Sequence, residues 1–263
     1  MNMKKLLACT LCILMLAACL TGCGSKGTTL AAVQKSGKLV IATSPDFPPF
    51  EMLDGSEVVG IEIDLMQLVC QKLGVTLEIR QMDFDSVLAG VQVGKFDAGV
   101  SGITVTPGRE KNMLFTVPYC LAAQAIVVPE GSAIASKADL AGKTIAVQTG
   151  TTAEEFCMAE GYAVNSYAAN TDAETALLSG KVDAWVIDDL TAAEMVKIQN
   201  AGDGQKLVIL SEAMTAEPYA IGFCKGSESL VAAVSEIIEA LVADGTVQAI
   251  FEKYDAPYTA PQS

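Results

Sequence analysis

The sequence predicts an α/β protein made of two similar units, each with a parallel sheet and crossover helices. Patterns typical of strands and helices alternate over residues 38–102, and the same alternation restarts at residue 143. Such alternation is typical of parallel sheets whose strands are joined by helices. The phrase Gly-Lys-X-Asp-Ala also occurs once in each half, as GKFDA at residues 94–98 and as GKVDA at residues 180–184. We therefore expect the chain to build one structural element twice.

The first half is expected to form three strands and two helices. KLVIAT and the alternating VTLEIRQ are typical of strands, and DAGVSG of a short buried strand. GIEIDLMQLVCQKLG has apolar residues at helical spacing, and DSVLAGVQVG is a short helix that ends at a glycine. In chain order, these elements are the strand at 38–43, the helix at 60–74, the strand at 75–81, the helix at 85–94 and the strand at 97–102.

The second half repeats this order. We expect strands at 143–150, 162–168 and 182–188, with helices from about Thr152 and at 172–180 between them. Residues 227–254 are amphipathic and helical, and packing is their expected role. Ligands of open α/β sheets bind at the carboxyl edge of the strands. Each repeated phrase begins a strand that is expected to end at such an edge. Arg109 follows the first of these strands, and Asp188 ends the second.

Composition excludes several classes of function. The 263 residues carry a net charge of −14 without a run of lysine or arginine, which argues against a nucleic-acid surface. The chain has no histidine, so Ser-His-Asp and Cys-His nucleophile systems and imidazole metal sites are excluded. We expect no metal site and no cofactor.

The N-terminal residues 1–22 have the form of a secretory signal peptide, with two lysines, an apolar run and then small residues. The sequence LTGC resembles the bacterial lipobox, in which the cysteine is lipidated and becomes the first residue of the mature protein. Cys23 is preferred to Cys19 of LAAC, because a Gly/Ser/Lys-rich stretch follows Cys23 directly. Residues 23–36 are then a lipidated cysteine and a flexible tether. An uncleaved membrane anchor is the alternative.

Four cysteines remain after this leader: Cys70, Cys120, Cys157 and Cys224. They are far apart along the chain and lie among apolar residues, so buried free thiols are the expected state. A disulfide stays open as an alternative, because an exported protein meets an oxidising compartment.

Motifs that follow one another in order resemble the bacterial extracellular solute-binding proteins of family 3, the amino-acid-binding proteins of ABC importers. They are ATSPDFPPFEM, VGIEIDL, SGITVTPGRE, VQTGTT and DAWVID, within about residues 37–256. The resemblance implies a type II periplasmic-binding-protein-like fold, in which two lobes are joined by two hinge crossings and enclose a ligand cleft. The crossings are expected near residues 120–124 and 217–221. Lobe 1 then consists of residues 37–124 and 219–263, and lobe 2 of residues 125–218.

A free amino acid presents a carboxylate and an ammonium group at one end. Arg109 carries a planar fork that can grip a carboxylate through two parallel hydrogen bonds, unless it is a surface arginine at a helix start. Thr151 and Thr152 stand where a strand gives way to a helix, and backbone N–H groups there favour an anion. An ordinary helix cap is the alternative for this stretch.

The resemblance assigns further contacts. It implies that Gly102 and Thr104 bond to the backbone groups of the ligand and that Asp188 binds its ammonium group. Asp189 is the competing acid, or instead the N-cap of the next helix. The resemblance also implies that Phe47 and Phe84 form walls for the ligand side chain. The full set of expected ligand-binding residues is Ser44, Phe47, Phe84, Gly102, Thr104, Arg109, Gln148, Thr151, Thr152 and Asp188. Ser44 departs from the aspartate of several family members.

By this resemblance the chain is a non-enzymatic, monomeric lipoprotein outside the cytoplasmic membrane. It would deliver a polar or basic amino acid, such as arginine, lysine or glutamine, to an ABC permease. The alternative is an enzyme of the same fold that dehydrates cyclohexadienyl acids such as arogenate, with Glu51, Asp46 or Asp85 as the general acid. A sensor module of a larger receptor is a third hypothesis, which the lack of a second hydrophobic segment before Ser263 disfavours.

Overall fold

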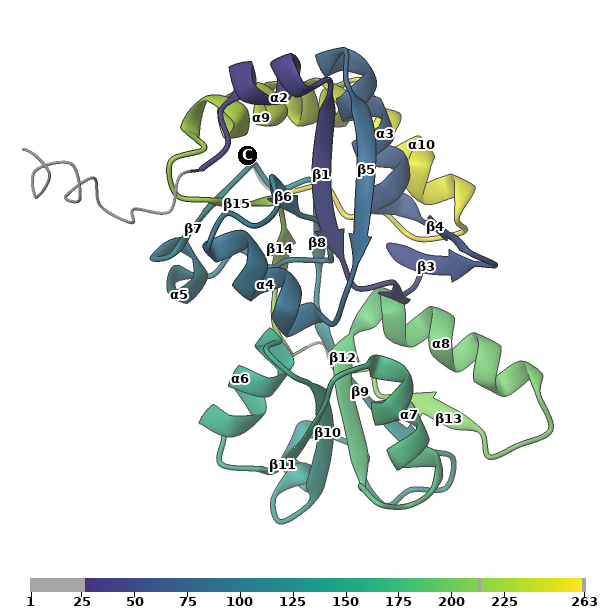
Figure 1. The fold of residues 1–263 in the computed structure, drawn as a ribbon. Coiled ribbons are helices and arrows are strands. Elements are labelled where there is room, and N and C mark those ends of the chain that lie inside the picture. The colour runs from purple at the N-terminus through teal and green to yellow at the C-terminus, as the bar shows by residue number, and fades with distance from the viewer. Residues whose placement is uncertain (1–26, 212–213, 262–263) are drawn as a thin grey trace, which may run out of the picture.

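The computed structural model describes residues 27–211 and 214–261 as two α/β lobes, one above the other in Figure 1. The predicted signal peptide and both candidate lipidation sites, Cys19 and Cys23, lie outside these residues. The upper lobe contains the start of the described chain and its C-terminal helices, and the lower lobe contains the middle of the chain (Figure 1). The two-lobed arrangement is the one that the sequence predicts.

Each lobe is built on a five-stranded mixed sheet. The strand order is β5-β1-β6-β15-β7 in the upper lobe and β11-β10-β12-β9-β13 in the lower lobe. The upper strands are β1 Lys38–Thr43, β5 Thr76–Gln81, β6 Ala98–Gly99, β7 Met113–Phe115 and β15 Gly222–Cys224. The lower strands are β9 Gln124–Pro129, β10 Thr144–Gln148, β11 Ala163–Tyr167, β12 Ala184–Asp188 and β13 Leu207–Ile209.

The expectation of purely parallel sheets is wrong for part of each lobe. Strand β1 pairs in parallel with β5 and β6, and β10 pairs in parallel with β11 and β12. However, β15 runs antiparallel to β6 and β7, and β9 runs antiparallel to β12 and β13. A crossover helix makes the two strands that it joins run in the same direction within their sheet. Within the described chain no α-helix lies between β9 and β10, and β15 enters the upper sheet only after the chain has passed through the lower lobe, so no crossover helix sets the direction of these two strands.

Helices cover both sheets and mostly begin and end where the sequence predicts. In the upper lobe they are α2 Leu30–Ser36, α3 Ile61–Leu73, α4 Phe84–Gln92, α5 Pro107–Glu110, α9 Glu228–Ala243 and α10 Thr246–Lys253. In the lower lobe they are α6 Thr152–Ala159, α7 Asn170–Leu178 and α8 Asp189–Ala201, with a 3-10 helix at Lys137–Leu140. Two expectations are wrong here. Helix α2 lies in the expected flexible tether and buries Val33, and the C-terminal helical segment is split at Gly245.

The repeated Gly-Lys-X-Asp-Ala phrase has the same structural role in both lobes. Gly94 and Gly180 both have φ of 70°, the left-handed conformation that ends a helix. The Asp97 carboxylate then accepts a hydrogen bond from the Val40 N–H at 2.8 Å, and the Asp183 carboxylate accepts one from the Thr144 N–H at 2.8 Å. Each aspartate therefore links the start of its own strand, β6 or β12, to the neighbouring strand, β1 or β10.

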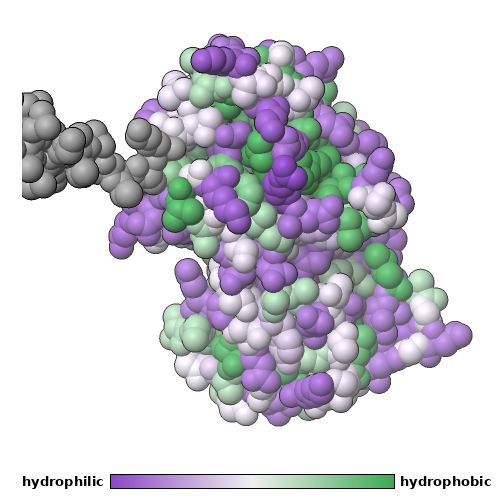
Figure 2. All heavy atoms as spheres, in the orientation of Figure 1, coloured by the Kyte–Doolittle hydropathy of each residue, from purple (hydrophilic) through white to green (hydrophobic). Residues whose placement is uncertain are grey.

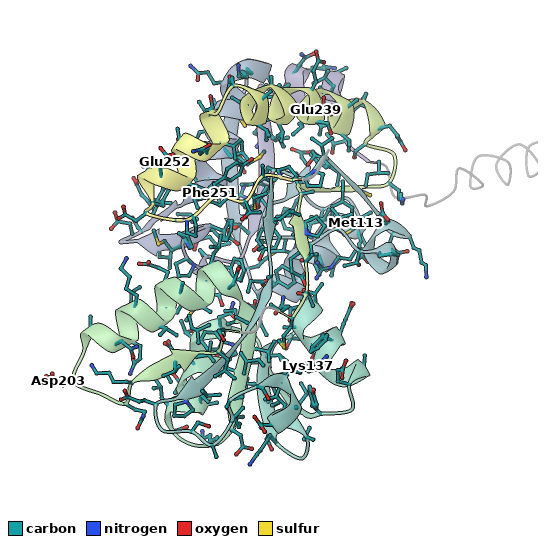
Figure 3. All side chains as sticks on the ribbon, turned by 180° about the vertical axis from the view of Figure 1, so that it is seen from behind. Met113, Lys137, Asp203, Glu239, Phe251 and Glu252 are labelled. Carbon is teal, nitrogen blue, oxygen red and sulfur yellow. The ribbon has the colours of Figure 1, made fainter. Side chains whose placement is uncertain are left out.

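Two short strands run between the lobes, β8 Cys120–Ala122 and β14 Glu217–Tyr219, and they pair with each other antiparallel. A separate small sheet follows β1 in the chain. It consists of β2 Asp46–Phe47, β3 Glu51–Asp54 and β4 Glu57–Val59. Seen from behind in Figure 3, Phe251 lies in the upper lobe, and Asp203 lies at the side of the lower lobe in the loop after α8. The residue limits of the lobes stay a prediction.

The core lies on both faces of each sheet. In β12, Trp185 and Ile187 share a hydrophobic cluster with α7 and α8, while Ala184 and Val186 share another with α6. Alternation along the strand therefore places Asp188, at its end, on the side of α6. The four cysteines Cys70, Cys120, Cys157 and Cys224 are free and buried.

Hydrophilic side chains cover most of the face drawn in Figure 2, and the outline is hollowed between the lobes. Within residues 27–211 and 214–261, no helix combines the length and the apolar character needed to cross a membrane.

Candidate functional site

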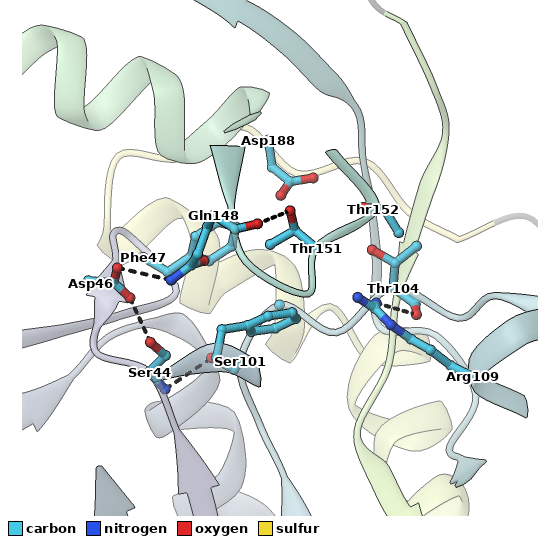
Figure 4. A pocket seen from close by; sticks show the side chains of 12 residues that line it. Ser44, Asp46, Phe47, Ser101, Thr104, Arg109, Gln148, Thr151, Thr152 and Asp188 are labelled. Atoms are coloured by element: carbon cyan, nitrogen blue, oxygen red, sulfur yellow. Dashed lines mark hydrogen bonds between the residues drawn. The ribbon is translucent and has the colours of Figure 1, made fainter. Parts of the chain in front are cut away.

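A pocket between the lobes is lined by all ten residues that the sequence singles out for ligand binding (Figure 4). It contains about 300 Å³ of space between protein atoms, part of it open to solvent. Asp46 and Ser101 line it as well. Some of these residues follow or end β1 and β6 in the upper lobe and β10 and β12 in the lower lobe. Others lie in β2, at the start of α4, in α5 and at the start of α6. The sheet edges to which the repeated phrase leads therefore face one another across this pocket.

Arg109 enters the pocket from α5, whose N-cap Thr106 accepts a hydrogen bond from the Arg109 N–H at 3.2 Å. The alternative of a surface arginine is wrong, because only 7% of this residue is exposed. Its guanidinium donates to the Thr104 carbonyl at 2.9 Å and to the Gly150 carbonyl of the lower lobe at 3.1 Å. It also lies over the Phe84 ring, 5.5 Å from the centroid.

No carboxylate among the described residues forms an ion pair with Arg109, although the charges of Glu155, Glu217 and Asp188 act on it from farther away. Burial lowers the pKa of Arg109, although the guanidinium stays charged at any physiological pH. Both observed hydrogen bonds go to neutral carbonyls, so the guanidinium keeps donors for an anion. A buried cation in this state is suited to a carboxylate ligand.

The turn after β6 requires a glycine. Gly102 has φ of 54°, and a Cβ added there would lie 2.5 Å from the Phe47 ring. The ring of Phe47 therefore packs directly against the backbone of this turn, as one wall of the pocket.

Two buried carboxyl groups hold the same turn from behind. The Ser101 hydroxyl donates to Glu51 at 2.7 Å, and the Gly102 N–H donates to Glu62 at 2.8 Å. The Tyr119 hydroxyl also donates to Glu62, at 2.7 Å. Both acids are fully buried. Sequence reasoning missed this network because its members come from four separate segments of the chain.

The two acids differ in their titration. Burial, followed by the charge of Glu62, raises the pKa of Glu51 well above its usual range. Burial also raises the pKa of Glu62, and the hydrogen bonds that it accepts from Tyr119 and Gly102 act in the opposite direction without cancelling this rise. We infer that Glu51 holds a proton and that Glu62 is the ionised partner.

In the lower lobe, Thr151 is the N-cap of α6, and its hydroxyl accepts the Glu154 N–H at 3.2 Å. The alternative of an ordinary cap is thus correct for the Thr151 side chain. The cap also orients the start of α6, with Thr152 as its first residue, toward the pocket. The helix N-terminus consequently adds positive potential to the pocket.

Asp188 is 8% exposed, and its carboxylate accepts a hydrogen bond from the Gln124 side-chain amide at 2.7 Å. Burial, and then the neighbouring Glu217, raise the pKa of Asp188 well above its usual range. Asp189 has a different role, since it accepts hydrogen bonds from the Ala123 and Leu190 N–H groups and is the first residue of α8 rather than the cap. Of the two acids, only Asp188 lines the pocket.

The pocket has two chemically distinct sides. Arg109 and Thr104 lie at one side in Figure 4, whereas Ser44, Asp46 and Gln148 lie at the other. Sequence reasoning named Asp46 only as a possible general acid and did not name Ser101. Their positions in SPDFPPF and beside Gly102 are the signals that could have identified them. The other proposed general acids, Glu51 and Asp85, do not line this pocket.

No group of three or more Cys, Asp or Glu side chains that could hold a metal ion occurs in the described part of the chain.

Comparison with known proteins identifies the family. The model of the bacterial extracellular solute-binding proteins, family 3, matches residues 39–256. The arginine-binding extracellular protein ArtP of Bacillus subtilis is 33% identical over 224 residues, which cover 82% of this chain and 86% of that protein.

Solved structures agree with this assignment. An ancestral arginine-binding protein bound to glutamine matches with a TM-score of 0.78 and 38% identity, over 84% of this chain and 99% of that one. The ancestral amino acid-binding protein AncCDT-1, a precursor of cyclohexadienyl dehydratase, matches with a TM-score of 0.79 and 32% identity, over 86% of this chain and 99% of that one. The chain belongs to the bacterial extracellular solute-binding proteins of family 3.

Proposed function

We propose that this protein is the substrate-binding lipoprotein of an amino-acid ABC transporter and captures a polar or basic L-amino acid between its lobes. One observation carries the proposal: Arg109 of the upper lobe and Asp188 of the lower lobe line the same pocket. An α-amino acid carries the complementary charges, a carboxylate and an ammonium group, on adjacent atoms. Lobe closure then completes a site that neither lobe forms alone. The expected lobes are residues 37–124 with 219–263, and residues 125–218.

In this proposal, the carboxylate of the ligand binds to Arg109. The guanidinium is buried, has no carboxylate partner among the described residues and lies on the same side of the pocket as Thr104. The N-terminus of α6 at Thr151 and Thr152 faces the same pocket from the other lobe. A guanidinium fork and a helix N-terminus both favour a carboxylate.

The ammonium group of the ligand is placed at Asp188. This acid is buried beside Glu217, and its carboxylate accepts a hydrogen bond from the neutral side-chain amide of Gln124. An ammonium ion would provide the missing positive charge and favour the ionised form of Asp188.

The side chain of the ligand is placed between Phe47 and Phe84, toward Ser44 and Gln148. These polar groups favour a polar or basic side chain over an aliphatic one. Relatives are named for arginine, and one related structure holds glutamine. Arginine, lysine and glutamine are therefore the first ligands to test.

Lipidation at Cys23 would hold the protein at the outer face of the cytoplasmic membrane, beside the permease. The motif LTGC supports this part of the proposal. Labelled fatty acid should enter the wild-type protein and not Cys23→Ala. Labelling that persists there and disappears in Cys19→Ala would move the anchor to Cys19.

A thermal-shift screen of the twenty amino acids, on protein starting at residue 24, tests the ligand. A basic or polar amino acid should raise the melting temperature, and its decarboxylated amine should not. An equal response to the amine would contradict a carboxylate site at Arg109.

The same pocket offers little to a dehydratase. Asp46 is the only proposed general acid that lines it, and its carboxylate already accepts hydrogen bonds from Ser44, Gln148 and Asn170. Incubation with arogenate or prephenate, followed by chromatography, should therefore leave the substrate intact. Turnover of either compound would replace the transport proposal with an enzymatic one.

A further inference from the structure

Helix α7 of the lower lobe begins without a cap of its own. Its N-cap residue is Ala169, which has the extended backbone of a capping residue (φ −117°, ψ 147°) and no side-chain hydrogen bond to the helix. The first N–H groups of a helix have no partners within the helix, and serine, threonine, aspartate or asparagine normally supplies one. Alanine cannot do so.

An aspartate of the upper lobe supplies the missing acceptor. The Asp46 carboxylate accepts the Asn170 N–H, at the first position of α7, at 2.6 Å. The same oxygen accepts the Gln148 side-chain amide at 3.2 Å, and the Ser44 hydroxyl donates to the other oxygen at 2.8 Å. Asn170 in turn donates to the Gln148 side-chain carbonyl at 3.0 Å. The cap thus reaches from one lobe to the other.

We propose that Asp46 is a positioning residue for ligand binding, which caps α7 across the cleft and so stabilises the closed arrangement of the lobes. All partners of the carboxylate belong to this chain, so the contact can form whichever amino acid is bound. The inference rests on the proposed function, in that closure of the lobes is what traps an amino acid. It adds that part of the closing free energy comes from the protein itself.

A direct contact between Asp46 and a cationic ligand side chain is the competing explanation. Asp46 lines the pocket, and a carboxylate has about four lone-pair sites, of which three are used here. The two explanations make different predictions. A direct contact matters only for cationic ligands, whereas a contact that stabilises closure changes the affinity for every ligand by the same factor.

Closure buries the Asp46 carboxylate, and this desolvation raises its pKa. Its hydrogen bonds to Asn170, Ser44 and Gln148 act in the opposite direction and favour the charged form. The positive N-terminal end of α7 also favours an anion at this position. Helix caps of this kind change equilibrium constants by roughly 3- to 30-fold.

Small-angle X-ray scattering of the ligand-free protein tests the contact without reference to any ligand. Asp46→Ala should have a larger radius of gyration than the wild type, because open molecules become more abundant. Asp183→Ala is the matched control: its carboxylate also accepts a backbone N–H at 2.8 Å, but both groups belong to the lower lobe. The control should scatter like the wild type. An unchanged radius for Asp46→Ala would overturn the proposal, even if no amino acid bound.

Calorimetry then separates the two explanations. Asp46→Ala should weaken the binding of L-arginine and of L-glutamine by the same factor, roughly 3- to 30-fold. A loss for arginine alone would instead identify a direct contact and overturn the proposal. If the wild type binds neither amino acid, the proposed ligand is wrong, and the scattering result alone decides the role of Asp46.

A second variant separates closure from ordinary helix stability. Ala169→Ser gives α7 a cap within its own lobe. Combined with Asp46→Ala, it should recover thermal stability but neither the compact ligand-free form nor the affinity. Recovery of affinity together with stability would show that Asp46 only stabilises the helix, and the proposal would fall.

Discussion

Arg109 is the residue on which the proposed specificity for amino acids depends most. Removing a bidentate charge-assisted contact from a closed cleft costs about 2–5 kcal/mol, or some 30-fold or more in affinity. We therefore expect this loss for Arg109→Ala. Arg109→Lys should recover only part of the affinity, because an ammonium group lacks the planar fork.

Calorimetry measures both Arg109 variants. Arg80 provides the control, since it is exposed in β5 and pairs with Glu78 away from the pocket. Arg80→Ala should bind like the wild type. Near-native affinity of Arg109→Ala would show that the carboxylate is bound elsewhere.

We expect the ionised Asp188 carboxylate to destabilise the ligand-free protein and to bind the ammonium group of the ligand. The pKa of Asp188 is raised in the folded protein, which means that the folded state favours the neutral carboxyl. The contribution of this group to the free energy of unfolding is therefore largest at low pH, and it is lost as the pH rises through the raised pKa. Asp188→Asn cannot ionise. Its melting temperature, measured without ligand, should therefore exceed that of the wild type by an amount that grows as the pH rises above about 4, the usual pKa of an aspartate.

The same variant should lose most of its affinity, because an amide cannot neutralise the ammonium group of the ligand. The exposed Asp203, at the side of the lower lobe in the loop after α8, provides the control, and Asp203→Asn should change neither quantity (Figure 3). A stability difference that does not vary with pH would mean that Asp188 is ionised already in the ligand-free protein.

At the level of elements, the turn after β6 depends on two acids of unequal charge. Burial and the charge of Glu62 raise the pKa of Glu51 well above its usual range and favour its neutral form, so Glu51→Gln should leave the free energy of unfolding almost unchanged. Glu62 accepts the Gly102 N–H and the Tyr119 hydroxyl as an ion, and hydrogen bonds to charged groups contribute about 1.5–3 kcal/mol. Glu62→Gln should therefore lower the free energy of unfolding by about that amount or more. Urea unfolding at pH 7 compares the two variants, and equal effects would contradict the unequal protonation.

The sequence predicts local elements well and their long-range pairing poorly. The helix at 60–74 and the strand at 38–43 follow from hydrophobic period and glycine ends, and the structure confirms them. The strand at 97–102 shrinks to β6 Ala98–Gly99, because the rest of that stretch becomes the turn of the pocket. The antiparallel direction of β15 depends on where distant chain segments meet, which no local period records.

The residues of the candidate site also fall into some that the sequence predicts and some that it does not. The ten residues taken from motifs line one pocket, because many of them follow strand ends at one edge of each sheet and the two edges face each other. Asp46 as a cap for α7 could not be predicted, since its partner Asn170 lies 124 residues away and in the other lobe. The buried acids behind the turn were hidden for the same reason.

For the whole molecule, Trp185 should report lobe closure without touching the ligand. It is fully buried in β12 and packs with α7 and α8, whereas Asp188 at the end of this strand lines the pocket. Closure changes the field around the strand, so a bound amino acid should cause a small, saturable change in tryptophan emission. The decarboxylated amine should cause none. A large shift toward the emission of exposed tryptophan would contradict this packing.

The central position of β15 in the upper sheet has a consequence for how the chain acquires its structure after synthesis. All five strands of the lower sheet come from one continuous stretch, residues 124–209, whereas β15 lies between β6 and β7 and belongs to residues 222–224. During export from the N-terminus onward, the lower sheet can pair as soon as its own residues have emerged. The upper sheet cannot be completed until nearly the whole chain is outside. We therefore expect the upper lobe, which carries Arg109, to fold after the lower lobe, so that one half of the binding site would form before the other.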